Sequence, residues 1–232
     1  MTSSKNCPRL ISLAVHEFRT PVTVAAGYAR MLVEGQAGEL TESQQRLVSE
    51  IERSCSRLSA LMAELGDLVK LDEGTVAFRH DNVRLFSLVA EVAATVHEGA
   101  DRGVRLDVQR PSEDVVIVGD PDRLRTALVA LFHVNLREKA DGTQVIADCS
   151  IRDTVGRPTA AVVIAEATEL MSVSEISPQT WGAFEQWRGG VGMSLPIADR
   201  VMAAHGGRLW SPRGKRVRTA TAVTLPVKEI FL

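Results

Sequence analysis

One short stretch near the N-terminus holds side chains whose types and spacing suit nucleophilic chemistry. It reads His16-Glu17-Phe18-Arg19-Thr20-Pro21. A neutral imidazole is a nucleophile, and the carboxylate of Glu17 can accept a hydrogen bond from one ring nitrogen of His16 and make the other more basic. On a helix, Thr20 lies one turn further on the same face, where its hydroxyl can position a water or a phosphoryl oxygen. Arg19 adds positive charge for an anionic group. We therefore expect His16, Glu17, Arg19 and Thr20 to form a catalytic site.

The same His-Glu pair also begins the zinc-protease pattern H-E-x-x-H. That pattern needs a second histidine four residues after His16, and Thr20 stands there instead. The other histidines lack metal-ligand spacing, so we expect no metal site; they are His80, His97, His133 and His205. Taken alone, His16 would best be interpreted as an ordinary surface histidine, and it is the full His16–Pro21 string in its helical hairpin that favours chemistry.

The residues around the motif predict a helical hairpin. Apolar residues recur at helical spacing from Pro8 to about Glu34, and His16 lies in the polar stripe of that helix. Pro21 predicts a kink just after the histidine. The run Gly35–Gly38 ends this helix, and a second helix begins after Thr41, the expected N-cap of a capping box completed by Gln44.

The second helix carries an apolar seam that predicts self-association. Its members alternate between gaps of four and three residues, which is a heptad pattern: Leu47, Ile51, Ser54, Leu58, Leu61, Leu65 and Leu68. Two amphipathic helices cannot bury such a face alone, so we expect two hairpins to pair as a homodimeric four-helix bundle. The alternative is a helical lid on the rest of the chain.

The remainder of the chain predicts a second domain, with residues 1–74 forming the hairpin domain and residues 75–232 the second. Strands and helices alternate there without a strict βαβ repeat, which predicts an α+β sandwich of one sheet and one helical layer. The expected strands are Val76–Arg79, Val104–Gln109, Val115–Gly119, Thr143–Ile151, Ala160–Ala165, Gly207–Ser211 and Thr219–Leu225, and the expected helices are Leu85–Glu98, Asp120–Arg137 and Gly192–Ala204.

Composition excludes several functional classes. The chain has 232 residues, of which 45% are hydrophobic and 24% charged, with a net charge of −2, as in an ordinary globular protein without a general affinity for nucleic acid. No apolar run approaches the ~20 residues that cross a bilayer, and the polar segment Met1–Arg9 is unlike a signal peptide. Three widely spaced cysteines favour a reducing cytoplasm. A basic cluster near the C-terminus fits a solvated hairpin: Arg208, Arg213, Lys215, Arg216 and Arg218.

The motif and its hairpin resemble the H box of two-component sensor histidine kinases. The resemblance implies that His16 is the phosphoacceptor, that Glu17 assists phosphotransfer, and that Thr20 assists the water-dependent dephosphorylation of a partner receiver domain. It also implies a response-regulator receiver domain as partner and a histidine-kinase ATPase type of sandwich after the hairpin. Some relatives of this family are histidine phosphotransferases on the same scaffold.

The second half of the chain resembles the ATP-binding domain of that family, but several of the residues at its nucleotide-binding positions differ. The stretch Gly119–Leu124 resembles the lead into the N-box helix, where the family has asparagines that hold Mg²⁺. Those positions fall on Ala130 and Val134, whose side chains offer no oxygen to a hard cation. Asn135 is adjacent, but one step along a helix turns its side chain by about 100°. The metal ligands implied by the resemblance are therefore missing.

The adenine-reading motif and the lid of that family are altered as well. The Asp of D-x-G-x-G corresponds to Ala165, and its glycines correspond to Ala167 and Glu169. After Trp181–Phe184, which resembles the F box, only Glu185–Gly189 stand where a flexible lid is expected. Part of the phosphate loop remains, with Gly190 and Gly192 as a remnant of a nucleotide-binding turn, and His205-Gly206-Gly207 matches the turn after the next helix.

Three functional interpretations remain open. The first is a phosphorelay protein whose His16 exchanges a phosphoryl group with a receiver aspartate and whose back domain does not bind ATP. The second is an active kinase core that uses ATP and Mg²⁺ to phosphorylate His16. The third is a non-enzymatic pseudokinase adaptor. The intact H box favours the first two, and the altered nucleotide motifs favour the first over the second.

Overall fold

The structure is a computed structural model that describes residues 7–153, 157–175, 182–187, 192–212 and 220–231. The contacts divide the chain into two compact units, Met1–Val76 and Ala77–Leu232. The first is helical and carries the motif, and the second is mixed α/β. No helix in these described ranges combines the length and the apolar character needed to span a membrane.

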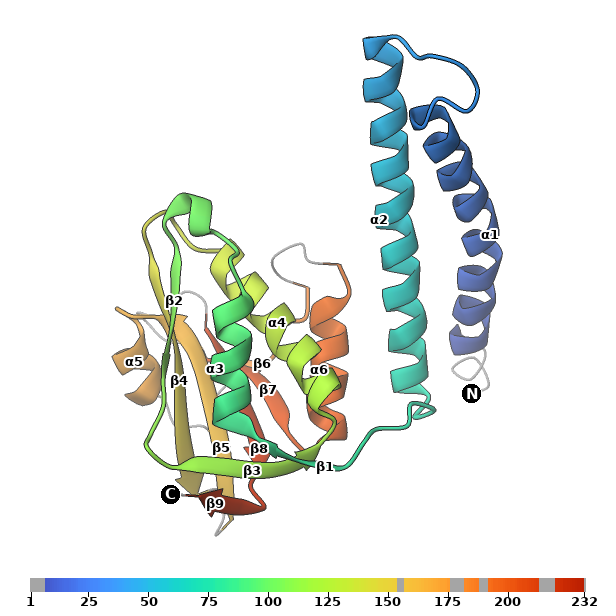
Figure 1. The fold of residues 1–232 in the computed structure, drawn as a ribbon. Coiled ribbons are helices and arrows are strands. Elements are labelled where there is room, and N and C mark those ends of the chain that lie inside the picture. The colour runs from blue at the N-terminus through green and yellow to red at the C-terminus, as the bar shows by residue number, and fades with distance from the viewer. Residues whose placement is uncertain (1–6, 154–156, 176–181, 188–191, 213–219, 232) are drawn as a thin grey trace. The chain divides into compact units, whose positions relative to one another are not determined.

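The first unit is an antiparallel helical hairpin of α1 (Cys7–Val33) and α2 (Glu42–Asp72) (Figure 1). The predicted capping box at the start of α2 is confirmed. The Thr41 hydroxyl accepts from the backbone N–H of Gln44 at 3.4 Å, and the Gln44 side chain accepts from the backbone N–H of Thr41 at 2.9 Å. Gly74, in the left-handed region at φ +66°, follows the end of α2. Helix α1 continues through Pro21 without a break.

Pairing of α1 with α2 covers only part of the apolar surface of the hairpin. In the described part of the hairpin, the buried apolar side chains are Val15, Ala29, Met62 and Val69. The large apolar side chains that remain exposed lie on both helices: Leu10, Leu13, Phe18, Val24, Tyr28, Met31, Leu47, Ile51 and Leu58. The first half of the heptad seam is thus open to solvent, and such a continuous apolar surface is typical of an interaction site.

The second unit contains two sheets, so the expectation of a single sheet is wrong. A six-stranded sheet has the order β2-β4-β5-β8-β7-β6, in which β2 and β4 are parallel and the other neighbours antiparallel. Its strands are β2 (Arg105–Gln109), β4 (Gln144–Asp153), β5 (Pro158–Glu166), β6 (Gly182–Ala183), β7 (Arg208–Ser211) and β8 (Thr221–Pro226). An antiparallel sheet of order β1-β3-β9 comprises β1 (Asp81–Arg84), β3 (Asp114–Gly119) and β9 (Glu229–Phe231).

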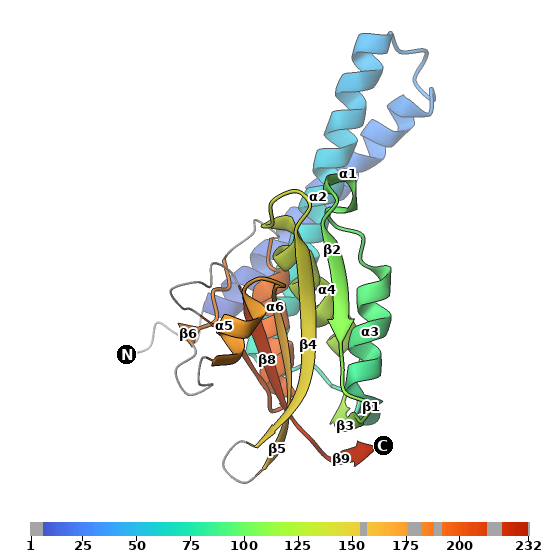
Figure 2. The same cartoon turned by 90° about the vertical axis from the view of Figure 1, so that its left-hand side faces the viewer.

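Helices cover both faces of the larger sheet to different extents. Three helices, α3 (Leu85–Thr95), α4 (Pro121–Arg137) and α6 (Ser194–Ala204), form a layer on one face (Figure 1). The short helix α5 (Leu170–Glu175) lies on the other side (Figure 2). Residues 160–165 of β5 are all buried, as expected for a central strand covered on both faces. The smaller core under α5 consists of Val163, Ala165, Val173, Ala220 and Ala222, with Leu170 and Trp210 packed against it.

Most of the predicted elements are present, but the strand expected at Val76–Arg79 is wrong. The chain is irregular there, and the first strand of this unit begins at Asp81. Phe78 and Arg79 instead contact His205 and Asp120, so tertiary contacts replace a strand ladder at this point. The short elements α5, β6 and β9 lie outside the predicted set.

Two titratable groups of this unit have pKa values shifted by their surroundings. The carboxylate of Asp114 caps α3 by accepting from the amides of Phe86 (2.9 Å) and Ser87 (3.1 Å) and from the Ser87 hydroxyl (2.6 Å). Burial alone would raise the pKa of Asp114, but these hydrogen bonds outweigh it and lower the pKa. Burial raises the pKa of the Cys149 thiol to about 12, with the charges of Asp148 and Asp114 adding to the effect.

Candidate functional site

His16 lies on an outward face of α1. The preceding residue, Val15, is buried beside Gly66 of α2. Because each step along an α-helix turns the side chain by about 100°, burial of Val15 directs its successor away from the helix pair. The His16 side chain is accordingly 76% exposed. A histidine in this position can be approached by another macromolecule.

Glu17 contacts one nitrogen of that imidazole. Its Oε1 lies 3.5 Å from Nδ1 of His16, and its own side chain is 70% exposed. An ion pair this exposed adds little to folding stability. Its chemical effect is on the tautomer, because a carboxylate beside Nδ1 favours the proton there and leaves the lone pair on Nε2. Within the described residues, the contact with Glu17 at Nδ1 is the one polar interaction of the His16 ring, which leaves Nε2 open to solvent.

Arg19 and Thr20 are exposed on the same helix. They follow His16 by three and four residues, the two spacings that place side chains next to each other on a helix. Pro21 has no N–H and cannot donate to the carbonyl of Glu17, which loosens the helix at the site. The structure therefore brings His16 and Glu17 together and leaves Arg19 and Thr20 open beside them.

The positions expected to hold Mg²⁺ in the second unit are part of its core. Ala130 and Val134 of α4 are both buried. Asn135 is completely buried, and its Nδ2 donates to the carbonyl of Leu131 at 2.8 Å and to the hydroxyl of Thr221 at 3.0 Å. The amide of Asn135 thus joins α4 to β8. Ala130 and Val134 therefore offer only hydrocarbon to a metal ion, and the amide of Asn135 is engaged in hydrogen bonds within the unit.

The positions expected to contact adenine are also packed. Ala165 belongs to the core under α5, and Glu169 is buried. Nζ of Lys139, whose side chain is fully buried, lies 3.2 Å from Oε1 of Glu166. The described residues contain no group of three His, Cys, Asp or Glu side chains that could hold a metal.

Of the remnant phosphate loop, Gly192 is exposed in the left-handed region at φ +69° and directly precedes Met193, the N-cap of α6. Gly190, and Trp181 of the sequence resembling the F box, lie outside the described residues. Phe184 is half-buried after β6. Within the described ranges, the expected phosphate loop therefore contains one glycine with positive φ and no charged side chain placed as a ligand.

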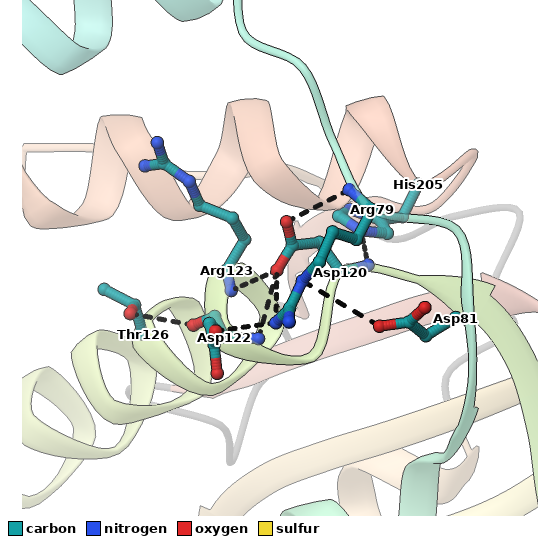
Figure 3. Close-up of polar contacts among 7 residues, drawn as sticks. All are labelled: Arg79, Asp81, Asp120, Asp122, Arg123, Thr126 and His205. Carbon is teal, nitrogen blue, oxygen red and sulfur yellow. Dashed lines mark hydrogen bonds and ion pairs between the residues drawn. The ribbon is translucent and has the colours of Figure 1, made fainter.

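A polar cluster that the sequence patterns did not connect lies at the N-terminus of α4 (Figure 3). The backbone N–H of Asp120 donates to Nε2 of His205 at 2.8 Å, and the backbone N–H of Arg79 donates to Oδ2 of Asp120 at 3.2 Å. The sequence indicated a helix start at Asp120 and a turn at His205. These residues are 85 positions apart, and no local signal links them.

Comparison with known proteins agrees with this architecture. Residues 9–74 match the family model described as His Kinase A (phospho-acceptor) domain. The chain is 27% identical over 217 residues to the signal transduction histidine-protein kinase BaeS of Escherichia coli K12, covering 92% of this chain and 45% of that protein. It is 23% identical over 232 residues to the sensor histidine kinase WalK of Bacillus subtilis 168, covering 92% of this chain and 36% of that protein.

A solved structure shares the fold. The crystal structure of full-length ShkA in complex with AMPPNP superposes with a TM-score of 0.68 at 23% identity, covering 95% of this chain and 46% of that one. The chain therefore spans less than half the length of these relatives.

The hairpin therefore matches a His Kinase A (phospho-acceptor) domain, and the second unit has the α+β fold that continues the match to ShkA. The relatives that match over most of the chain are named as histidine kinases. The chain is thus similar to two-component sensor histidine kinases along most of its length.

Proposed function

We propose that this protein is a phosphorelay member of the family, in which His16 exchanges a phosphoryl group with the aspartate of a response-regulator receiver domain. The observation that carries the proposal is the exposed imidazole with Glu17 at Nδ1 and an accessible Nε2. Residues 1–74 would then be the dimerisation and phosphotransfer domain. Residues 75–232 would be a degenerate ATP-binding domain that helps to hold the receiver.

The proposed step is a displacement at phosphorus. The lone pair of Nε2 forms the N–P bond, the P–O bond of the receiver acyl phosphate breaks, and the aspartate carboxylate leaves with that electron pair. The proton on Nδ1 stays in place, and the carboxylate of Glu17 offsets the positive charge that the ring acquires. Arg19 is placed to attract the incoming anion, and Thr20 to position a water for the hydrolytic reaction. The reverse transfer uses the same groups.

The second unit supports the part of the proposal that concerns ATP. In-line transfer from ATP depends on Mg²⁺ and on close positioning of the triphosphate. Here Ala130 and Val134 offer no oxygen, and the amide of Asn135 is bonded to Leu131 and Thr221. We infer that the phosphoryl group comes from a receiver and not from ATP.

The alternative is a kinase that phosphorylates His16 from ATP. The observation that favours it is that the relatives matched over most of the chain are themselves histidine kinases. The third candidate, a non-enzymatic adaptor, is less well supported, because an adaptor does not need an exposed imidazole with a carboxylate at Nδ1.

We also propose that the hairpin forms a homodimer. Its exposed apolar side chains lie on both helices and include the first half of the heptad seam, such as Leu47 and Ile51. Pairing with a second hairpin would bury them in a four-helix bundle. The cytoplasmic location expected from the cysteine pattern remains a prediction.

Nucleotide binding separates the two main candidates. The full chain is titrated with Mg·ATP in a calorimeter, and acid-labile phosphate on the protein is measured by mass spectrometry. We expect no saturable binding and no phosphate from ATP. Binding in the micromolar range together with phosphate on His16 would establish the kinase instead.

The phosphoacceptor assignment is tested with receiver domains phosphorylated by acetyl phosphate. Wild-type protein is expected to exchange phosphate with its cognate receiver, and His16→Ala to abolish the exchange while the dimer persists. His97→Ala, which removes another exposed histidine, is the matched control and should behave as wild type. Exchange that persists in His16→Ala disproves the assignment, and a wild type inactive with every receiver favours the adaptor.

A further inference from the structure

The segment that enters the second unit is held by contacts rather than by a strand. The guanidinium of Arg79 lies 2.6 Å from Oδ2 of Asp122 and 3.6 Å from Oδ1 of Asp120 (Figure 3). The backbone N–H of Arg79 donates to Oδ2 of Asp120. The neighbouring ring of Phe78 meets the imidazole of His205 edge to face, with centroids 5.2 Å apart and an angle of 81°. These contacts connect the entering segment to Asp120, Asp122 and His205.

Asp120 connects this segment to α4. It is the N-cap, and its Oδ1 accepts from the amides of Asp122 (3.1 Å) and Arg123 (3.2 Å). Burial would raise the pKa of Asp120, but the amide hydrogen bond from Arg79, those at the helix start and the charge of Arg79 together lower it. The carboxylate consequently stays ionised at neutral and mildly acidic pH and remains an acceptor.

His205 holds the backbone of Asp120 from the other side. Nε2 accepts from the Asp120 N–H at 2.8 Å, and Nδ1 lies 2.7 Å from the carbonyl oxygen of Val201. Since a carbonyl only accepts, Nδ1 carries the proton and Nε2 is bare. Only this neutral tautomer makes both bonds.

The backbone leaves a space fitted to the imidazole. A Cβ at Gly119 would stand 2.4 Å from Cδ2 of His205 and 2.9 Å from Nε2, so any side chain at this position would displace the ring. The ring also borders a pocket of about 320 Å³ whose other lining residues include Val118 and Pro226, and this pocket lets water and protons reach it.

We propose that His205 is a pH-responsive clasp that holds the entering segment, Ala77–His80, against the second unit while its imidazole is neutral. Protonation of Nε2 would point an N–H at the N–H of Asp120, which removes one hydrogen bond and adds a repulsion at the residue that holds Arg79. The segment directly follows the hairpin unit in the chain. Its release would therefore lengthen the linker between the two units. The proposal is independent of the role of His16.

The charged and titratable groups around the ring come from three elements. Asp120 and Asp122 belong to the start of α4, Arg79 and His80 to the entering segment, and Lys228, which lines the same pocket, to the residues before β9. His80 is the other histidine among these groups. It therefore needs its own control.

The test is hydrogen exchange of the full chain at about pH 8 and pH 5, the interval in which histidines change charge, with intrinsic exchange rates divided out. Protection of the Arg79 and Asp120 amides is expected to fall roughly three- to ten-fold at the lower pH, as for the loss of one hydrogen bond. His205→Gln should make that protection independent of pH, whereas His80→Gln should leave the wild-type response. Protection that is equal at both pH values in the wild type, or a response that persists in His205→Gln, overturns the proposal.

Two further measurements do not depend on folding of His205→Gln. Gly119→Ala displaces the ring without altering a titratable group, so it should lower protection of both amides at both pH values. Side-chain ¹H–¹⁵N correlation spectra of the wild type should show the Nδ1–H tautomer of His205 at pH 8. Unchanged protection in Gly119→Ala, or the Nε2–H tautomer, would contradict the clasp.

Discussion

The buried pair of Asn135 and Thr221 gives a sharp test of how the second unit uses its N-box helix. Both residues are completely buried, and the Thr221 hydroxyl accepts from Nδ2 at 3.0 Å and donates to Oδ1 at 3.4 Å. Thr221→Val keeps the shape of the side chain and removes both interactions. A buried amide deprived of such a partner costs about 1–3 kcal/mol of unfolding free energy. For a unit of this size that corresponds to a decrease in Tm of roughly 2–12 °C.

The assay is urea and thermal unfolding followed by tryptophan fluorescence, because the three tryptophans all lie after residue 77 and report on the second unit. Asn135→Leu combined with Thr221→Val removes both partners, so the double variant should be less destabilised than the sum of the single variants by about 1 kcal/mol. Thr126→Val, at an exposed position of the same helix, should change the free energy of unfolding by less than about 0.5 kcal/mol.

The result also bears on nucleotide binding. If the Asn135 amide is used by the fold, Mg·ATP should leave the wild-type unfolding midpoint unchanged, since a ligand raises stability only when it binds the native state. Additive single and double variants, or a Thr221→Val protein as stable as the wild type, would refute the assignment of Asn135 to the fold. A midpoint that rises with Mg·ATP would refute the inference that ATP is not the donor.

Three further predictions concern the interface and two titratable groups. Combined Ile51→Glu and Leu58→Glu should lower the mass measured by light scattering from that of two chains to that of one, because charges then replace exposed apolar seam positions; an unchanged mass would contradict the proposed interface. Because the pKa of Asp114 is lowered in the folded state, its stabilisation is present above about pH 4 and lost as the pH falls below that value, so Asp114→Asn should flatten the acid limb of the stability curve. The Cys149 thiol, with its pKa raised to about 12, should resist alkylation in the native protein at pH 8 while Cys55 reacts; equal rates would show that the sheet opens readily.

Local signals in the sequence were sufficient to predict those features that depend on one short segment of the chain. The capping box of Thr41 and Gln44 involves residues three positions apart, and its hydrogen bonds form as predicted. Helical periodicity likewise predicted the exposure of His16, because the pattern of apolar residues fixes which face turns inward. Both features are properties of single helices.

Features that depend on distant residues could not be predicted in the same way. The sequence indicated that Asn135 points away from the metal position, but its partner Thr221 lies 86 residues further on, and only the packing of α4 on β8 brings them together. The Asp120–His205 contact is of the same kind. The failed strand at Val76–Arg79 has the same origin, because the pattern there was apolar and extended while the contacts made by Phe78 are tertiary.

The second unit shows why fold and activity must be argued from different residues. Strand β5 is buried on both faces, and α4 packs through Leu124, Leu128 and Leu131, whose apolar side chains have no oxygen to offer a metal or a nucleotide. The positions that would bind the metal or adenine can therefore be occupied by Ala130, Val134 and Ala165 without loss of the fold, and all three side chains are buried. The similarity to the ShkA structure solved with AMPPNP consequently reflects the shared fold. It does not indicate whether Ala130, Val134 and Ala165 permit nucleotide binding. The side chains at those positions are the basis of our proposal that a phosphorylated receiver, and not ATP, supplies the phosphate for His16.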